Sequence, residues 1–257
     1  MLVELDGDEI EIAQWNGSGR GRAQQRSIVL LHEGLGSVSA WGDFPERLAA
    51  LTCCRVLAYS RAGYGSSTIV EEPFDVDYMH REAEVLNRLL DRLQVARPIL
   101  FGHSDGASIA LIAAARYPER AAALVLEAPH VFVEDLTVKS IAEITAGYPS
   151  NARLRRSLAR HHRNADLTFR RWSDIWLNPA FREWNITACL PQIAAPVLVF
   201  QGAQDEYGTA LQLEAIVAAI PQAECVMLED CRHSPHRDAR NAVLERTADF
   251  VQDVRVA

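Results

Sequence analysis

One segment of the chain, residues 97–117, strongly limits the backbone conformation that it can adopt, because glycines flank a serine at fixed spacing. Residues 97–101 form a short apolar run that favours a β-strand, and residues 107–117 form an alanine-rich run that favours an α-helix. Gly102-x-Ser104-x-Gly106 joins the two runs. Glycines two positions on either side of the serine let strand and helix approach closely through a sharp turn. The segment therefore predicts a strand, a turn and a helix, with Ser104 at the tip.

This arrangement makes Ser104 a candidate nucleophile. A serine in such a turn stands above the sheet, and the peptide N–H of Asp105, at the start of the helix, faces the same space. That amide and the helix dipole would stabilise an oxyanion that develops on a bound carbonyl group. The alternative is a structural role in which Ser104 only caps the helix. The two interpretations differ in whether a base and an acid accompany the serine.

The downstream chain offers the base and the carboxylate that a hydroxyl nucleophile requires. Asp205 lies in the loop after the apolar run 196–201, and His233 lies in the loop after the apolar run 225–228. The chain order Ser, Asp, His, with each residue just beyond a strand, is that of the α/β-hydrolase fold. We therefore predict Ser104 as nucleophile, His233 as base and Asp205 as the acid that orients the base.

Strand-like and helix-like patterns alternate along most of the chain. A hairpin is expected at 2–5 and 9–14, a flexible loop at 16–22, later strands at 28–31, 56–59, 97–101, 122–126, 197–201 and 225–228, and helices at 44–51, 78–93, 107–117, 210–219 and 238–251. Such alternation implies right-handed crossovers and a mostly parallel, doubly wound sheet covered by helices on both faces. The fold class is therefore α/β, with the candidate site at the carboxyl ends of the strands.

Five motifs in this order resemble those of α/β hydrolases with a serine nucleophile, over about residues 27–254. They are residues 29–34, residues 60–67, the Ser104 turn, the Asp205 loop and the His233 loop. More narrowly, His32–Ser37, Glu127–His130 and His233–His236 resemble a group of bacterial α/β hydrolases.

The resemblance also implies an oxyanion hole formed by the backbone amides of Asp105 and Gly34. Glu33 stands where most members of the family have glycine, and Glu33 and Leu35 are expected to contact substrate. Glu127, at the end of the sixth strand of the fold, is the alternative to Asp205, because some members place the acid there.

The alternation breaks between residues 134 and 190, where this fold usually carries a helical cap. We therefore expect a hydrolase core at 1–133 and 191–257 and a cap insertion at 134–190. Trp172, Trp176 and Trp184 lie in the insertion and are predicted to contact substrate. Their spacing is equally consistent with an apolar stripe that docks the cap on the core.

The same insertion is rich in arginine. The cluster consists of Arg153, Arg155, Arg156, Arg160, Arg163, Arg170 and Arg171. One interpretation is attraction of an anionic substrate, such as a carboxylate or the phosphate of an acyl-CoA. A solvated helix face is the commoner cause of such a run.

Composition limits the partners and the location. A formal net charge of −8 argues against nucleic-acid binding. No stretch has the apolar length of a membrane span, the N-terminus lacks the basic charge of a signal peptide, and the five cysteines form no paired framework. We therefore expect a cytoplasmic protein without a membrane partner.

The histidine and cysteine spacings complete no tetrahedral set, so neither a metal nor another cofactor is expected. Nothing in the sequence specifies an oligomeric state.

The sequence thus predicts two-step acyl transfer to water from a small-molecule acyl substrate, with a carboxylic ester or thioester as the expected bond. The same residues also serve lactone hydrolysis and the cleavage of C–C bonds in vinylogous diketones. A different class of function is a ligand receptor on a hydrolase scaffold with slow or absent turnover. The complete set of serine, histidine and aspartate argues against a receptor, since binding alone does not need it.

Overall fold

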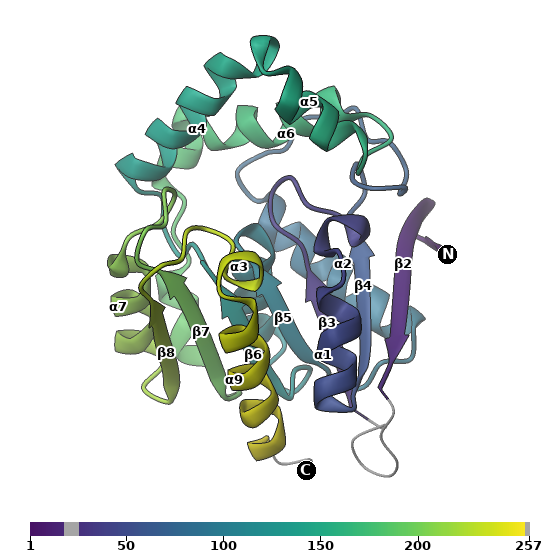
Figure 1. Ribbon diagram of the computed structural model, residues 1–257, viewed down its shortest axis with the longest axis vertical. Helices are drawn as coiled ribbons and strands as arrows, with labels where there is room; N and C mark the ends of the chain where they lie inside the picture. The colour runs from purple at the N-terminus through teal and green to yellow at the C-terminus, as the bar shows by residue number, and fades with distance from the viewer. Residues whose placement is uncertain (18–25, 255–257) are drawn as a thin grey trace.

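A central sheet of eight strands organises the computed structural model, which describes residues 1–17 and 26–254 (Figure 1). The strands are β1 (Leu2–Leu5), β2 (Asp8–Asn16), β3 (Ser27–Leu31), β4 (Arg55–Ser60), β5 (Ile99–His103), β6 (Ala123–Glu127), β7 (Val197–Gly202) and β8 (Ala223–Leu228). Their order is β1-β2-β4-β3-β5-β6-β7-β8, and only the pairs β1–β2 and β2–β4 are antiparallel. The predicted α/β-hydrolase fold is confirmed. The loop expected at 16–22 falls mostly outside the described residues.

Helices cover both faces of the sheet. On one face lie α1 (Phe44–Thr52) and α9 (Arg240–Asp253), and on the other lie α2 (Tyr78–Arg92), α3 (Asp105–Arg116) and α7 (Ala210–Ala219) (Figure 1). The buried strands alternate between the two resulting cores: in β3, Ile28 and Leu30 face α1 and α9, whereas Val29 and Leu31 face α2 and α3. This alternation follows from the two-residue period of a strand and explains why the central strands are apolar on both faces.

The C-terminal region differs slightly from the sequence expectation. A single helix is expected at 238–251, but the structure has a short helix α8 (Pro235–Asp238) and then α9, separated at Ala239. Proline is favoured at the first position of a helix, which explains why α8 begins at Pro235. No helix among the described residues combines the length and apolar character needed to cross a lipid bilayer.

The insertion between β6 and β7 lies above the carboxyl ends of the strands (Figure 1). Its elements are α4 (Asp135–Gly147), η3 (Tyr148–Ser150), α5 (Ala152–Ala159), α6 (Ala165–Trp176), η4 (Pro179–Glu183) and η5 (Thr187–Gln192), and η2 (Val38–Trp41) lies below it in the core. Element η5 packs against α3 and α7 and crosses the expected boundary at residue 190. The division into core and cap stays a prediction.

Polar contacts attach this insertion to helix α7 and to loops of the core below it. Glu134, just before α4, accepts hydrogen bonds from the backbone and hydroxyl of Thr209 and from Gln212, all at 2.6 to 2.9 Å. At the other end, His162 bonds to the backbone N–H of Gly65 at 3.0 Å and to the carbonyl oxygen of Leu35 at 2.8 Å. The insertion is therefore attached to the core at two places, Glu134 and His162, and the second contact reaches the turn that contains Leu35.

The Ser104 turn brings α3 against the end of β3. A Cβ atom on Gly106 would lie 2.7 Å from the carbonyl oxygen of His32 and closer still to that of Leu31. We therefore expect Gly106→Ala to lower the free energy of unfolding by about 1–3 kcal/mol, the usual cost of overpacking, as measured by urea denaturation.

Gly147→Ala is the matched control, because a Cβ at this helical glycine meets nothing within 4 Å. This variant should be more stable by about 0.5 kcal/mol, through a smaller entropy of the unfolded chain. Equal unfolding free energies for the two variants would contradict the close approach.

Candidate active site

Ser104 occupies the sharp turn between β5 and α3. Its backbone has φ 53° and ψ −118°, in the positive-φ region that non-glycine residues rarely adopt. The neighbouring chain holds this conformation: the N–H of Ser104 donates to the carbonyl of Glu127 at 2.9 Å, and the Ser104 carbonyl accepts the N–H groups of Ala107 and Ser108. The strained backbone raises the hydroxyl above the ends of the strands.

The structure brings the three predicted triad residues together. The Oγ atom of Ser104 lies 2.9 Å from Nε2 of His233, and Nδ1 of the same ring lies 2.8 and 2.9 Å from the two carboxylate oxygens of Asp205. Asp205 follows β7, and His233 lies in the loop before α8. Each atom is thus within hydrogen-bonding distance of the next, in the order that proton transfer from the serine requires.

The protein stabilises Asp205 in its ionised form. Gln201 and the backbone N–H groups of Tyr207 and Gly208 donate hydrogen bonds to this carboxylate, at 2.6, 2.8 and 3.3 Å. Burial raises the pKa of Asp205, but the His233 ring and the hydrogen bond from the Tyr207 backbone outweigh burial and hold the pKa below its usual value. The carboxylate therefore stays charged beside the imidazole.

Three imidazoles lie close together here, and only one is suited to act as the base. Burial lowers the pKa of His233, but the Asp205 carboxylate raises it more, so that the pKa lies above 6.5. Burial lowers the pKa of His130 to about 4 and that of His103 well below its usual value, so both rings are neutral. His103 donates from Nε2 to the carbonyl oxygen of His233 at 2.7 Å and so supports the loop that carries the base.

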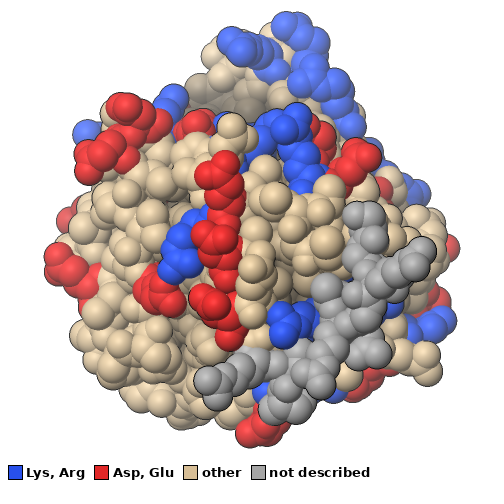
Figure 2. Space-filling model, turned by 60° about the horizontal axis from the view of Figure 1, so that its bottom comes forward, with Lys and Arg blue, Asp and Glu red and all other residues tan. Residues whose placement is uncertain are grey.

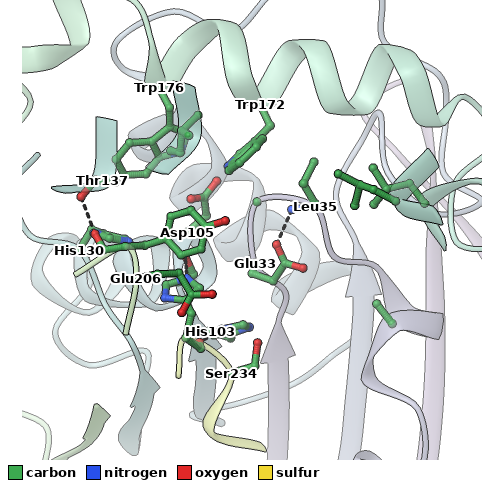
Figure 3. A pocket seen from close by; sticks show the side chains of 18 of the residues that line it. Glu33, Leu35, His103, Asp105, His130, Thr137, Trp172, Trp176, Glu206 and Ser234 are labelled. Carbon is green, nitrogen blue, oxygen red and sulfur yellow. Dashed lines mark hydrogen bonds between the residues drawn. The ribbon is translucent and has the colours of Figure 1, made fainter. Parts of the chain in front are cut away.

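The amides of Asp105 and Gly34 have no protein acceptor among the described residues, so they remain available to an oxyanion. Gly34 lies under α6, where a Cβ would collide with the indole of Trp172. Arg61 fixes the turn from beneath by donating to the carbonyl oxygens of His32 and Glu33, at 2.7 and 3.1 Å. The Glu33 side chain accepts the N–H of Leu35 at 2.5 Å (Figure 3), which closes the turn on itself.

The side chain of Asp105 is a feature that the sequence analysis missed. It is fully buried, accepts a hydrogen bond from the Tyr78 hydroxyl at 2.9 Å and lies 4.0 Å from the Arg61 guanidinium. Burial raises the pKa of Asp105 against the opposing effects of Arg61 and Tyr78. A charged residue directly after the nucleophile was the available signal, but its partners lie far away in the sequence.

A cavity of about 260 Å³ opens above Ser104. Glu33, Leu35, Trp172 and Trp176, all predicted to contact substrate, line it, and the two indoles descend from α6 toward Asp105 (Figure 3). The predicted substrate contact of Trp184 is not found, because this residue does not line the cavity. Its ring stacks on Phe181 and meets Trp176 edge-on. Trp184 directly follows η4, is buried, and contacts the Trp176 ring rather than the cavity.

None of the seven arginines of the predicted cluster lines the cavity. Arg171 is buried and donates to the backbone carbonyls of Glu72 and Ala62, and Arg155 pairs with Asp166 at 3.3 Å. The other five are exposed on α5, on α6 and in the link between them. The structure therefore does not support the hypothesis that this cluster contacts a substrate inside the cavity.

Glu127, the alternative acid, serves a different histidine. Its carboxylate lies 2.6 Å from Nδ1 of His236, and both side chains are buried. His103, Glu127 and His236 form the one group in the described chain whose side chains could together hold a metal ion, with atoms within 4.8 Å of one another. The Glu127–His236 bond ties the end of β6 to α8. The carboxylate that bonds to His233 is that of Asp205.

Several known proteins are similar to this chain in sequence or in fold. The mouse (Mus musculus) protein named serine hydrolase BPHL is 26% identical over 234 residues, covering 89% of this chain and 80% of that protein. A 2-hydroxy-6-oxononadienedioate/2-hydroxy-6-oxononatrienedioate hydrolase of Comamonas testosteroni is 24% identical, covering 92% and 90%. Among solved structures, the esterase RhEst1 from Rhodococcus sp. ECU1013 superposes with a TM-score of 0.76 at 19% identity, covering 99% and 98%.

The family profile described as the alpha/beta hydrolase family matches residues 28–246, which include β3, the Ser104 turn, Asp205 and His233. That match spans most of the chain and includes all three residues of the candidate triad. The chain therefore belongs to the alpha/beta hydrolase family.

Proposed function

We propose that this protein is a serine hydrolase that cleaves a small carboxylic ester or thioester through an acyl-enzyme intermediate. The observation that carries the proposal is the continuous hydrogen-bonded series from Ser104 through His233 to Asp205 at the floor of a cavity. A serine hydroxyl is a weak nucleophile by itself, and an adjacent oriented base is what activates it. The names of the relatives, which include a serine hydrolase and an esterase, support the same activity.

Each group has a role in the proposed reaction. His233 takes the hydroxyl proton of Ser104 as Oγ attacks the carbonyl carbon, and Asp205 holds the tautomer of His233 and stabilises the imidazolium. The amides of Asp105 and Gly34 bind the oxyanion. His233 then gives its proton to the departing alcohol or thiol, and a water that His233 deprotonates cleaves the acyl-enzyme.

The cavity supports a small and partly apolar substrate. Its volume of about 260 Å³ is small beside that of common ligand sites. Trp172, Trp176, Leu35 and Ile141 form apolar parts of its wall, whereas the triad and Glu33 form polar parts. A short acyl chain against the indoles would leave the carbonyl group above Ser104.

Two alternatives use the same residues. The similarity to a hydrolase of a dienedioate from Comamonas testosteroni favours C–C bond cleavage as the second candidate, with lactone hydrolysis beside it. A ligand receptor with slow turnover is the alternative of another class. A product assay over an ester, a thioester, a lactone and a vinylogous diketone separates the bond types, and titration with a fluorophosphonate separates all of them from an unreactive binder.

The first test removes the nucleophile. Ser104→Ala should abolish hydrolysis of a small p-nitrophenyl ester and labelling by a fluorophosphonate, because no acyl-enzyme can form. The far-UV circular dichroism spectrum and unfolding midpoint should stay close to those of the wild type. Normal turnover by a folded Ser104→Ala variant would remove Ser104 from the mechanism.

A second test decides between the two carboxylates. Asp205→Asn should lower kcat by roughly 10⁴-fold, the effect of a comparable change in another triad, whereas Glu127→Gln should lower kcat far less. Both variants replace a buried carboxylate that bonds to a histidine, so each is the control for the other. A larger loss in Glu127→Gln would move the role of the acid to Glu127.

The third test is the dependence of kcat/KM on pH for a neutral ester. His233 acts as a base only when it is neutral, and its pKa lies above 6.5 because of Asp205. The activity should therefore rise with pH, with a midpoint above this value in the wild type. Asp205→Asn should move the midpoint of its residual activity downward. A midpoint below 6.5 in the wild type would contradict the ionised Asp205.

A further inference from the structure

Arg237 stands at the edge of the cavity, four residues after His233. Of the described residues that line the cavity, it is the only arginine or lysine. The Nη2 atom of Arg237 donates to the carbonyl oxygen of Ala40 at 3.0 Å, which holds the guanidinium beside η2. This exposed side chain forms no ion pair with a carboxylate in the described part of the chain. Its charge is therefore available to an anion.

Two neighbours add to the positive character of this edge. Arg160, at the end of α5, donates to the hydroxyl of Ser157, a cavity residue, at 3.3 Å. Burial lowers the pKa of His161, which lines the cavity, and the charges of Arg160 and Arg237 lower it further, so both guanidinium groups act on this ring. Figure 2 shows Lys and Arg side chains gathered over the cap and beside the hollow below it.

Most carboxylates of the cavity have partners away from this edge. Glu206 pairs with Arg232 at 2.8 Å, and Asp105 is buried at the floor with Tyr78 and Arg61. Glu33 does act on the edge, because its charge raises the pKa of His161 against the two arginines. An anion at the edge would therefore meet two guanidinium groups against one carboxylate.

Arg237 lies close in the chain to the base that would protonate the leaving group. His233 must protonate the leaving atom, so that atom lies within hydrogen-bonding distance of Nε2. Ser234 and Arg237 follow His233 within four residues and line the cavity with it. A substituent that extends outward from the leaving atom would therefore pass Arg237.

We infer that Arg237, with Arg160 beside it, binds an anionic group on the leaving group of the substrate, a carboxylate or a phosphate. The inference rests on the proposed acyl transfer and narrows its substrates to esters or thioesters of acidic alcohols and thiols. A coenzyme A thioester has such a leaving group. Of the arginine cluster predicted from the sequence, this proposal keeps only Arg160, and it adds Arg237 at the edge of the cavity.

Two pairs of butyryl thioesters test the inference, with thiol release as the assay. The first pair is S-butyryl mercaptopropionate and its neutral methyl ester; the second is butyryl-CoA and S-butyryl pantetheine, which lacks the phosphates. In at least one pair, the anionic member should have a kcat/KM about five-fold higher at low salt, the size of one exposed ion pair. The preference should fade at high salt. A preference in the first pair indicates recognition of a carboxylate close to the thioester, and a preference in the second pair indicates recognition of a phosphate farther from it.

Arg237→Gln should bring the ratio of kcat/KM within the responding pair close to one, through KM of the anionic member. Arg160→Gln should reduce the same ratio less. The control is Arg246→Gln, a half-buried arginine of α9 that pairs with Glu224 and does not line the cavity. It should leave the ratio unchanged, which excludes an effect of net charge alone.

Binding without turnover gives an independent readout. The Ser104→Ala variant should bind the anionic member of the responding pair more tightly than the neutral one in calorimetric titration. Hydrolysis of all four thioesters at equal kcat/KM would overturn the anion subsite and leave the serine hydrolase proposal intact. If the wild type shows no thiol release, neither in a first turnover nor later, and no fluorophosphonate labelling, both the anion subsite and the serine hydrolase proposal are overturned.

Discussion

The close approach of α3 to the end of β3 is the constraint on which the rest of the site depends. Gly106 packs against the carbonyl groups of Leu31 and His32, with no room for a Cβ atom. This contact brings the first amide of α3 next to the turn that begins at His32, and thus places Asp105 and Gly34 on the same side of Ser104. The positive φ of Ser104 accompanies this approach, because strand and helix meet there at a sharp angle.

Buried polar groups connect this turn to the loop that carries the base. The His103 ring, one residue before the nucleophile, bonds to the His233 carbonyl, and Glu127, whose own carbonyl accepts the Ser104 N–H, bonds to His236. The ends of β5 and β6 are thereby tied to His233 itself and to His236, three residues later. Removing one member of a buried pair leaves the other without its partner, which costs more than the bond itself contributes. The distance between Ser104 and His233 is therefore set by more than their own hydrogen bond.

The fold and the triad could be predicted from the sequence because each depends on local patterns. Ser104, Asp205 and His233 each follow an apolar run, and parallel strands bring their carboxyl ends to one edge. The partners of Trp184 and of Glu127 could not be predicted, because they depend on how η4 and α8 are rotated against other elements. The arginine cluster illustrates the same difficulty: spacing along a helix gives the relative faces of its residues but not which face meets the cavity. Only Leu154, Ser157, Leu158 and His161 of this region turn inward.

Arg61 shows how a buried charge can support an oxyanion site that contains a carboxylate. A negative Asp105 side chain so close to the nucleophile would oppose the charge that forms on the substrate oxygen. Arg61 lies 4.0 Å from Asp105 and is bonded to the carbonyls of His32 and Glu33. The same planar guanidinium thus offsets the carboxylate and orients the turn that contains Gly34. A lysine would offer a single point of charge and could not reach both carbonyl groups in this fixed geometry. The need for an arginine at this position follows from the acid beside the nucleophile.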